Sequence, residues 1–545
     1  MRHSWGLKVG LGMVRVPWDG PMERRFCHPR PMRMEGSPAS PPARMQTFRI
    51  NPAFRVIVLW GTLIWGVALA PCPRLPAAEP RPNFLVIIGE AQGWSSLSAG
   101  MDDQIPGSAS DLNQTPNLDR IAREGMRFSN FYAPSPRCTP SRAAFFTGKS
   151  PARLHMTFIS EGKGDAGGGE GTRLIPPRAI TELPTTETTL GGLLRESGYV
   201  TAHFGKWHLG RTDPARHGYE ENTGPTANGG PDNSPNPNPR EAFASAGRGA
   251  DFMARAVKAG RPFYLQVAEY AGRSALDARP ETVAAVRARG GGKDLPRLGA
   301  AAVAEDADSS YGILLRKLDE LGITGSTYVI YTSDHGAPGR NPPLTGGKGS
   351  LGEGGVRVPL LVRGPGVRPG SFARQRTLGV DLFPTIAELA GVSTARLHDL
   401  EGGSLVPVLR GAGLGLIRRP REEYVIHFPH YDKDPGGPAS ALYLGDYKLM
   451  RFYEGEEFHL YNVVLDPGER HDLALQQPDQ LAGLQARLRD YLVAVDAGMP
   501  AMNPHPDPSK PASSLPGDRR GGRGGRPGGR GGSGVDRPRL GRGGE

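Results

Sequence analysis

Residues 84–89 read FLVIIG, an uninterrupted apolar run of strand length that ends just before Glu90. Three more such runs follow along the chain: YVTAHF (199–204), FYLQVA (263–268) and TYVIYTSD (327–334). Segments with helical spacing separate them, and this alternation is typical of a sheet covered by helices on both faces. The chain is therefore predicted to have an α/β fold whose large mixed, mostly parallel sheet lies between helices.

Two of the helical segments have clear ends. TPNLDRIAREG (115–125) begins with Thr115 as N-cap and Pro116 in the first turn, and AEDADSSYGILLRKLDELG (304–322) closes at Gly322. Several strands end in Gly, Asp or His just before a loop. Polar side chains are thus predicted at the carboxyl edge of the sheet, where folds of this kind bind ligands.

The pattern changes after about residue 420 to short strands and turns. Gly445-Asp446 suggests a hairpin within this region. The predicted strands are EYVIHF (423–428), ALYLGDYKLMRF (441–452) and FHLYNV (458–463). One amphipathic helix closes the region through Leu481, Leu484, Leu488, Tyr491 and Leu492. We expect an α/β domain over residues 79–420 and a small antiparallel subdomain with a terminal helix over 421–497.

The two ends of the chain differ from this body. Residues 56–70, VIVLWGTLIWGVALA, form an apolar run that is short for a membrane span, and 45–78 are predicted to be a signal peptide. Residues 1–44 are interpreted as a mis-assigned extension, and the Pro-, Gly- and Arg-rich residues 498–545 as a disordered tail. The protein is therefore predicted to be exported, either periplasmic or secreted. A membrane anchor, or a lipid anchor at Cys72, is the alternative.

The excess of basic residues belongs to these ends. The formal net charge is +11, of which residues 1–70 contribute +7 and residues 518–545 contribute +5. The body between them is close to neutral, which disfavours a specific nucleic-acid-binding function. The Arg-Gly tail is expected either to contact polyanions through weak, screened attraction or to remain solvated without a partner.

Cysteine usage directs attention to one residue. The three cysteines are Cys27, Cys72 and Cys138, and cleavage after Ala78 would leave only Cys138. No internal disulfide is then possible. A lone thiol in an oxidising compartment is either an inert buried residue or a functional group.

The segment RCTPSRAAFFTGK (137–149) places Cys138 directly before a predicted helix, with Pro140 near its first turn and Arg142 one turn in. A helix N-terminus lowers the pKa of a thiol and presents backbone N–H groups to an anion. Cys138 and Arg142 together therefore predict a site for a tetrahedral oxyanion.

The string CTPSR (138–142) resembles the signature of the sulfatase family, Cys-x-Pro-Ser-Arg. Other segments between residues 81 and 475 resemble further blocks of that family, in the same order: RPNFLVII (81–88), TPNLDRIAREGMRFSNFYA (115–133), GKWHLG (205–210), TSDHG (332–336), GGKGSLGEGGVRVPLLVRGPG (346–366) and DLFPTIAELAG (381–391). The resemblance implies an alkaline-phosphatase-like fold. It also implies that a formylglycine-generating enzyme oxidises Cys138 to formylglycine.

A hydrated aldehyde at position 138 would offer two hydroxyls, one to attack sulfur and one to expel sulfate by re-forming the carbonyl. Sulfuryl transfer also requires a divalent cation, Ca²⁺ or another, and several cationic donors. By resemblance the catalytic residues are Cys138, Arg142, Lys206, His208 and Lys348, and the metal ligands are Glu90, Cys138, Asp334 and His335. Without the resemblance, Lys206 and His208 would be interpreted as surface residues beside Trp207, and Lys348 as an ordinary loop charge. His155, His203 and His217 are interpreted as structural or peripheral.

Two positions depart from the family pattern. The family usually has two adjacent aspartates after the first strand, where this chain has Glu90 and Ala91, followed by Gln92. Ala91 supplies no metal ligand. After FYLQVAEYA the family has a histidine, whereas Arg273 stands here and is expected to contact a sulfate oxygen rather than to donate a proton.

These residues predict a sulfatase acting on a sulfated small molecule or polysaccharide. Two alternatives remain: a catalytically impaired sulfatase-like protein that binds sulfated glycans, and a phosphate or phosphonate ester hydrolase using the same pocket. Loops over residues 211–245 and 272–298 are expected to shape the pocket.

Overall fold

The computed structural model describes residues 81–507 except 160–170, 231–240, 273–274 and 291–294. The predicted extension (1–44), signal peptide (45–78) and Arg273 lie outside the described residues, as does most of the predicted tail. Within the described part of the chain, no helix combines the length and the apolar character that crossing a bilayer requires.

The main sheet has eight strands in the order β10-β2-β9-β8-β1-β7-β5-β6. Every neighbouring pair is parallel except the two pairs made by β9. The strands are β1 (Asn83–Gly89), β2 (Met126–Phe128), β5 (Val200–Gly205), β6 (Glu221–Asn222), β7 (Phe263–Ala268), β8 (Thr327–Ser333), β9 (Leu360–Arg363) and β10 (Ser371–Ala373). The mixed, mostly parallel sheet predicted from the apolar runs is confirmed.

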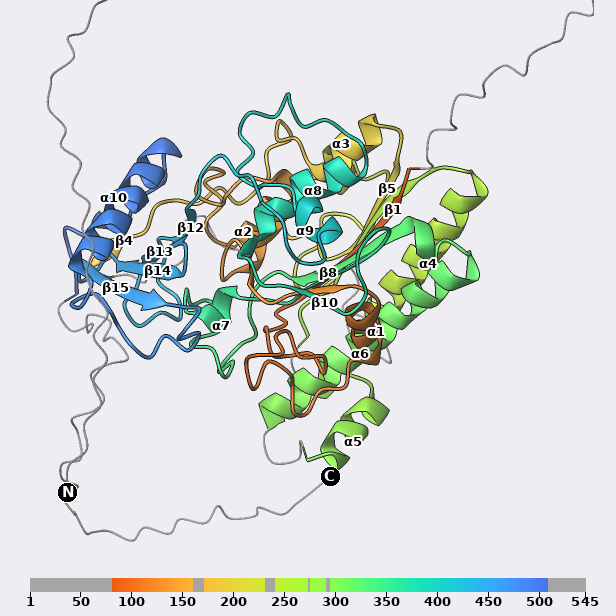
Figure 1. The fold of residues 1–545 in the computed structure, drawn as a ribbon, viewed down its shortest axis with the longest axis horizontal. Coiled ribbons are helices and arrows are strands. Elements are labelled where there is room, and N and C mark those ends of the chain that lie inside the picture. Colours follow the sequence, from red (N-terminus) through yellow and green to blue (C-terminus); the bar gives the residue numbers. More distant parts are fainter. Residues whose placement is uncertain (1–80, 160–170, 231–240, 273–274, 291–294, 508–545) are drawn as a thin grey trace, which may run out of the picture. The chain divides into compact units, whose positions relative to one another are not determined.

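Helices cover both faces of this sheet (Figure 1). One face carries α2 (Cys138–Thr147), α3 (Leu190–Glu196), α8 (Leu382–Leu389) and α9 (Val406–Arg410). The other carries α1 (Pro116–Glu124), α4 (Ala242–Lys258) and α6 (Leu295–Glu320), with α5 (Pro280–Ala288) packed against α6. Because successive strand residues point to opposite faces, Val86 enters the first core and Leu85 the second. This two-sided burial explains why the central strands are continuous apolar runs.

The C-terminal region forms a four-stranded antiparallel sheet, also as predicted. Its strands are β12 (Tyr424–Phe428), β13 (Ala439–Leu444), β14 (Tyr447–Phe452) and β15 (Glu457–Asn462). Gly445, with a φ of 55°, and Asp446 form the tight turn between β13 and β14. Helix α10 (Pro478–Ala494) packs Leu484 and Leu488 onto one face of the sheet.

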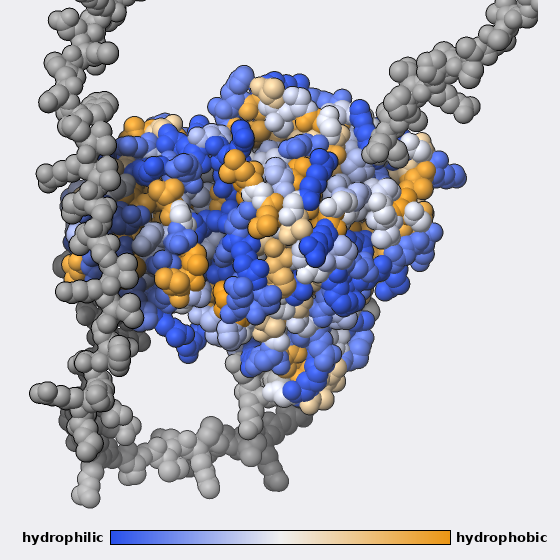
Figure 2. Space-filling view, in the orientation of Figure 1, coloured by the Kyte–Doolittle hydropathy of each residue, from blue (hydrophilic) through white to orange (hydrophobic). Residues whose placement is uncertain are grey.

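The remaining elements are short. β3 (Phe131–Tyr132) pairs with β11 (Thr377–Leu378), and α7 (Glu353–Val356) follows a glycine-rich loop. Within the described residues, 3-10 turns span Pro214–His217, Ala275–Asp277, Thr324–Ser326 and Gly379–Asp381. Figure 2 shows one face of the molecule as largely hydrophilic, with apolar residues scattered in small groups.

The structure differs from the sequence prediction at two element ends. Helix α6 begins at Leu295, nine residues before the predicted start at 304, because the alanine-rich segment before residue 304 favours helix. Residues 498–507, which were placed in the disordered tail, are described, and β16 (Ala501–Met502) pairs with β4 (Leu174–Ile175). Main-chain pairing of this kind needs no aliphatic side chain, so composition did not reveal it.

A buried histidine makes stability sensitive to acid. The His427 side chain lies in β12 with its Nδ1 2.7 Å from Ser440 Oγ and its Nε2 2.8 Å from the Gly498 carbonyl oxygen, so Nε2 carries the proton and donates. Burial lowers the pKa of His427 to about 4. As the pH falls from about 6.5 to 4, the unfolded chain takes up a proton that the folded state refuses. This removes up to about 3 kcal/mol from the free energy of unfolding.

We predict that His427→Gln, which keeps an amide donor without titrating, flattens the fall of unfolding free energy between pH 6.5 and 4. The free energy is measured by urea denaturation at several pH values. His505→Gln, at an exposed histidine, should leave the curve unchanged. An identical acid loss in the His427→Gln protein and the wild type would contradict the assignment.

Candidate active site

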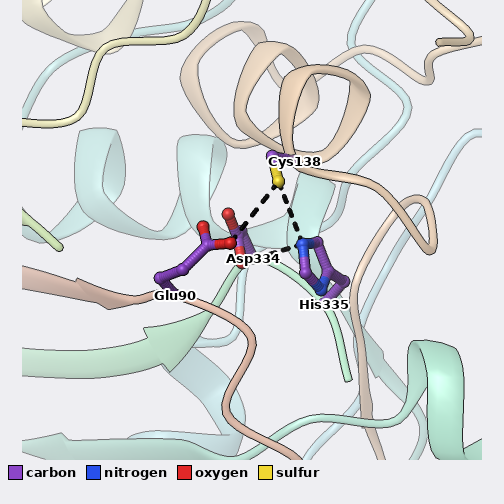
Figure 3. Close-up of side chains that lie close together, drawn as sticks. All are labelled: Glu90, Cys138, Asp334 and His335. Atoms are coloured by element: carbon purple, nitrogen blue, oxygen red, sulfur yellow. Dashed lines mark hydrogen bonds and ion pairs between the residues drawn. The ribbon is translucent and has the colours of Figure 1, made fainter. Parts of the chain in front are cut away.

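The predicted site residues meet at the carboxyl edge of the main sheet. Glu90 follows β1, Lys206 follows β5, and Asp334 and His335 follow β8. These strands are parallel and close together in the sheet, so the residues after them gather at one edge. Cys138, the first residue of α2, faces the Glu90, Asp334 and His335 side chains (Figure 3).

Glu90 is the central carboxylate of the site and is 5% exposed. Lys206 Nζ donates to Glu90 Oε2 at 2.6 Å, and Lys348 Nζ donates to Glu90 Oε1 at 3.0 Å. Burial opposes ionisation of Glu90, but the two ammonium groups outweigh it and hold the pKa of Glu90 well below its usual range. Glu90 is therefore a permanent anion that fixes two cations.

A second buried pair lies beside it. Arg142 Nε and one of its terminal nitrogens both donate to Asp334 Oδ2 at 3.2 Å, and neither side chain has exposed surface. The other terminal nitrogen of Arg142 donates to the Lys206 carbonyl oxygen at 2.6 Å. Arg142 thus connects α2 to the ends of β5 and β8 and presents a fixed positive charge at the site.

The Cys138 thiol lies among these groups. Its Sγ is 3.1 Å from His335 Nε2, 3.5 Å from Lys348 Nζ and 3.7 Å from Glu90 Oε1. Burial and the Glu90 carboxylate disfavour the thiolate, but Lys206, His335 and Lys348 together hold the pKa of Cys138 well below its ordinary value. A cationic environment of this kind favours any negatively charged species that forms at position 138.

Lys348 is placed by a glycine-rich loop. Lys348 N donates to the Ala337 carbonyl oxygen at 2.9 Å, and Gly349 N donates to the Pro136 carbonyl oxygen at 3.0 Å. A Cβ atom at Gly355 would lie 2.0 Å from the Ser350 carbonyl oxygen. Glycine is therefore required for the loop to fold tightly enough to bring Lys348 to Cys138.

The donor set fits a divalent cation. One ligand atom each from Glu90, Cys138, Asp334 and His335 lies within 4.8 Å of the others, which is about twice a Ca²⁺–oxygen distance. His335 Nδ1 donates to the Gly336 carbonyl oxygen at 3.0 Å, so Nε2 is the ring nitrogen turned toward the cluster, and it would bind a cation in its unprotonated form. Ala91 contributes only its backbone N–H, which donates to Asp334 Oδ1 at 3.1 Å.

The other predicted residues have different positions. His208 is buried, and its carbonyl oxygen accepts a hydrogen bond from Thr139 Oγ1 at 2.9 Å, which connects it to the start of α2. His203 is buried in the core, with its Nδ1 3.1 Å from Gln266 Oε1. Arg273 lies outside the described residues. The structure thus brings together Glu90, Cys138, Arg142, Lys206, Asp334, His335 and Lys348.

Two groups near the site, Glu269 and Arg137, were not predicted from the sequence. Glu269 directly follows β7, and its Oε2 accepts a hydrogen bond from Glu90 N at 2.9 Å; its place after a strand was a usable signal. Burial raises the pKa of Glu269 to about 7. Arg137, next to Cys138, forms a two-pronged ion pair with Asp432. These two residues are 295 positions apart in the chain, and no local pattern indicated their contact.

The fold and the site define an α/β protein with a buried cluster of cationic and carboxylate side chains at the carboxyl edge of its main sheet, and four side chains there could hold a metal ion. The chain belongs to the sulfatase family, a family of sulfuric ester hydrolases. The Sulfatase family model matches residues 82–392, and the model for the C-terminal region of N-sulphoglucosamine sulphohydrolase matches residues 348–497.

Relatives cover most of the chain. The N-acetylgalactosamine-6-sulfatase of Canis lupus familiaris is 32% identical over 79% of this chain and 88% of its own length. The steryl-sulfatase of Mus musculus is 29% identical over 82% of this chain and 86% of its own. Among solved structures, Ps i-CgsB in complex with k-i-k-neocarrahexaose shares the fold with a TM-score of 0.62 at 24% identity, over 76% of this chain and 93% of that one.

Ala91 offers a test of the metal-ligand set. Its φ of 55° is a left-handed conformation that Asp and Asn adopt more readily than Ala. Ala91→Asp is predicted to raise the affinity for Ca²⁺ about tenfold or more, because ligand charge governs calcium affinity. Calorimetric titration of chelator-treated protein measures the effect. Ala91→Asn provides the same backbone preference without the charge, and equal affinities of the two variants would count against the prediction.

Proposed function

We propose that the protein hydrolyses sulfate esters of carbohydrates, using a formylglycine made from Cys138 and a divalent cation. One observation carries the proposal: three buried cationic side chains, Arg142, Lys206 and Lys348, meet around Cys138 together with two carboxylates. The two carboxylates balance only two of the three positive charges, so the buried site has a surplus positive charge that an anion would neutralise. A sulfate group beside a divalent cation would do so.

The proposal implies a formylglycine at position 138 and a bound divalent cation, and each supplies different chemistry. A hydrated formylglycine would provide one hydroxyl that attacks sulfur as the bond from sulfur to the sugar oxygen breaks and the sugar alcohol leaves, and a second whose loss of a proton re-forms the carbonyl as the C–O bond to sulfate breaks. A divalent cation held by Glu90, Asp334, His335 and the residue at position 138 would neutralise charge on the sulfate oxygens.

The chain's own residues then have distinct roles. Lys348, 3.5 Å from Cys138 Sγ, and Lys206 stabilise the negative charge that develops on the equatorial oxygens of sulfur. Glu90 Oε1 and His335 Nε2, 3.7 Å and 3.1 Å from Cys138 Sγ, would hold the cation next to the side chain at position 138 and so orient that side chain. Arg142 donates to Asp334 and so fixes the position of that carboxylate, and its own side chain forms the α2 side of the site.

The carbohydrate class of substrate rests on relatives. The related N-acetylgalactosamine-6-sulfatase is named for a sulfated sugar, and the Ps i-CgsB structure holds a neocarrahexaose. The related steryl-sulfatase is named for a sulfated sterol, so sulfated sterols belong in the substrate panel as competing candidates.

The first test concerns the nucleophile. In protein purified from its native host, mass spectrometry of the peptide containing Cys138 is expected to show –CH₂SH replaced by –CHO, and Cys138→Ala is expected to release no sulfate. An unmodified thiol in protein that nevertheless turns over would remove formylglycine from the mechanism. Mass spectrometry of the N-terminal peptide tests the expected export, since cleavage after Ala78 predicts a mature N-terminus at Glu79.

The second test concerns charge stabilisation. Lys348→Met is predicted to lower kcat for sulfate release about 10²–10³-fold, the usual cost of removing one preorganised donor to a transition state. Lys258→Met, at an exposed lysine of α4, serves as the control and should retain full activity. If wild-type protein binds sulfated glycans and the cation but releases no sulfate, the glycan-binding alternative replaces this proposal.

A further inference from the structure

A large cleft of about 1140 Å³ lies next to the candidate active site and has no role in the reaction described above. One wall is the glycine-rich loop that carries Lys348, and the other is a face of the C-terminal sheet that includes Phe452, His459 and Tyr461. Arg137, the residue before Cys138, also lines it. Because Lys348 contacts Cys138 Sγ at 3.5 Å, a ligand bound at position 138 would have this cleft beside it.

The sheet wall of the cleft is aromatic. His459 and Tyr461 are two residues apart on β15 and therefore point to the same face. Their rings are stacked, with centroids 6.3 Å apart and an interplanar angle of 8°. Phe452, on the neighbouring strand β14, meets the His459 ring edge-on at 5.7 Å. All three aromatic side chains line this wall of the cleft, and aromatic side chains suit the apolar C–H groups of a sugar ring.

The acidic residues of the cleft already have partners inside the protein. Asp434 accepts hydrogen bonds from Ser350 Oγ and from Leu351 N. Glu469 accepts from Lys448 Nζ at 2.6 Å, and Asp472 Oδ2 lies 2.7 Å from His459 Nδ1. Burial also raises the pKa of Asp434 to about 6 and that of Glu469 to about 7. These groups therefore present little unbalanced negative charge to a ligand.

Two cations of the cleft are in the opposite situation. Lys433 and Arg470 are exposed, and within the described residues neither side chain takes part in an ion pair or hydrogen bond. Lys433 N donates to the Gly349 carbonyl oxygen at 3.2 Å, which fixes the Lys433 backbone to the loop of Lys348. The unbalanced charge of the cleft is thus positive and close to the candidate reaction centre.

We propose that this cleft binds the neighbouring residue of an acidic oligosaccharide, with its ring against His459 and Tyr461 and its anionic substituent on Lys433 and Arg470. The substituent is a carboxylate or a second sulfate, since both accept hydrogen bonds from an ammonium or a guanidinium group. This inference rests on the proposed function and narrows its substrate to sulfated chains that carry a further negative charge near the ester.

The test compares three kinds of sulfate ester: 4-nitrophenyl sulfate, a neutral disaccharide with a single sulfate, and disaccharides in which the sulfated residue is joined to a uronate or to a second sulfated sugar. Lys433→Gln combined with Arg470→Gln is expected to lower kcat/KM on the acidic disaccharides about tenfold to a hundredfold, mainly through KM. Activity on the other two esters should stay unchanged. The two acidic arms show whether a carboxylate or a second sulfate is preferred.

Lys258→Gln combined with Arg287→Gln is the matched control, because it removes the same charge from exposed residues of α4 and α5. Tyr461→Ala is expected to weaken activity on every disaccharide but not on 4-nitrophenyl sulfate. Equal losses on all three kinds of ester, or no loss on the acidic ones, would overturn the cleft assignment.

A binding measurement on protein without turnover tests this inference independently of the proposed function. Calorimetric titration of Cys138→Ala protein with the acidic disaccharides, with and without the Lys433 and Arg470 substitutions, reports on the cleft without turnover. A loss of affinity on substitution supports the cleft, and unchanged affinity refutes it. Failure of the wild-type protein to hydrolyse any of the esters would refute only the proposed function.

Discussion

The buried carboxylate of Glu90 is the interaction on which the site depends. A charge removed from water is tolerated only when it is paired, and Glu90 is paired twice, by Lys206 at 2.6 Å and by Lys348 at 3.0 Å. These ion pairs join the end of β1 to the end of β5 and to the glycine-rich loop. The arrangement of positive charge around Cys138 is therefore a consequence of keeping Glu90 ionised.

A second buried network of ion pairs and hydrogen bonds holds the two walls of the cleft together. Lys448 of β14 has no exposed side-chain surface and donates to the Leu351 carbonyl oxygen at 2.6 Å, to Glu353 at 3.2 Å and to Glu469 at 2.6 Å. Glu353 also accepts hydrogen bonds from two tyrosine hydroxyls. Because Leu351 and Glu353 lie three and five residues after Lys348, this network fixes the end of the glycine-rich loop to the C-terminal sheet and so sets the spacing between the two walls of the cleft.

The departure at Ala91 is best understood through this charge balance. Glu90 and Asp334 bring two negative charges to the site, whereas Arg142, Lys206 and Lys348 bring three positive ones. With one carboxylate fewer than the family pattern, the cluster would hold a divalent cation less strongly but attract an anion more strongly. The buried site thus keeps an excess of positive charge, which would favour a sulfate group, while one carboxylate of the family pattern is absent.

The sequence by itself determined what depends on neighbours along the chain. Burial on two faces requires unbroken apolar strands, and a tight hairpin requires a residue such as Gly445. Cys138 and Arg142 share one helical turn. Each of these features is visible in a short stretch of sequence, so local pattern was enough to predict it. Resemblance to a family supplied Lys206, Lys348 and Asp334. Only the tertiary structure showed the ion pair between Arg137 and Asp432 and the position of Lys433 beside the loop of Lys348. These contacts join segments that are far apart in the sequence. They depend on the paths of loops, which no periodic pattern in the sequence encodes.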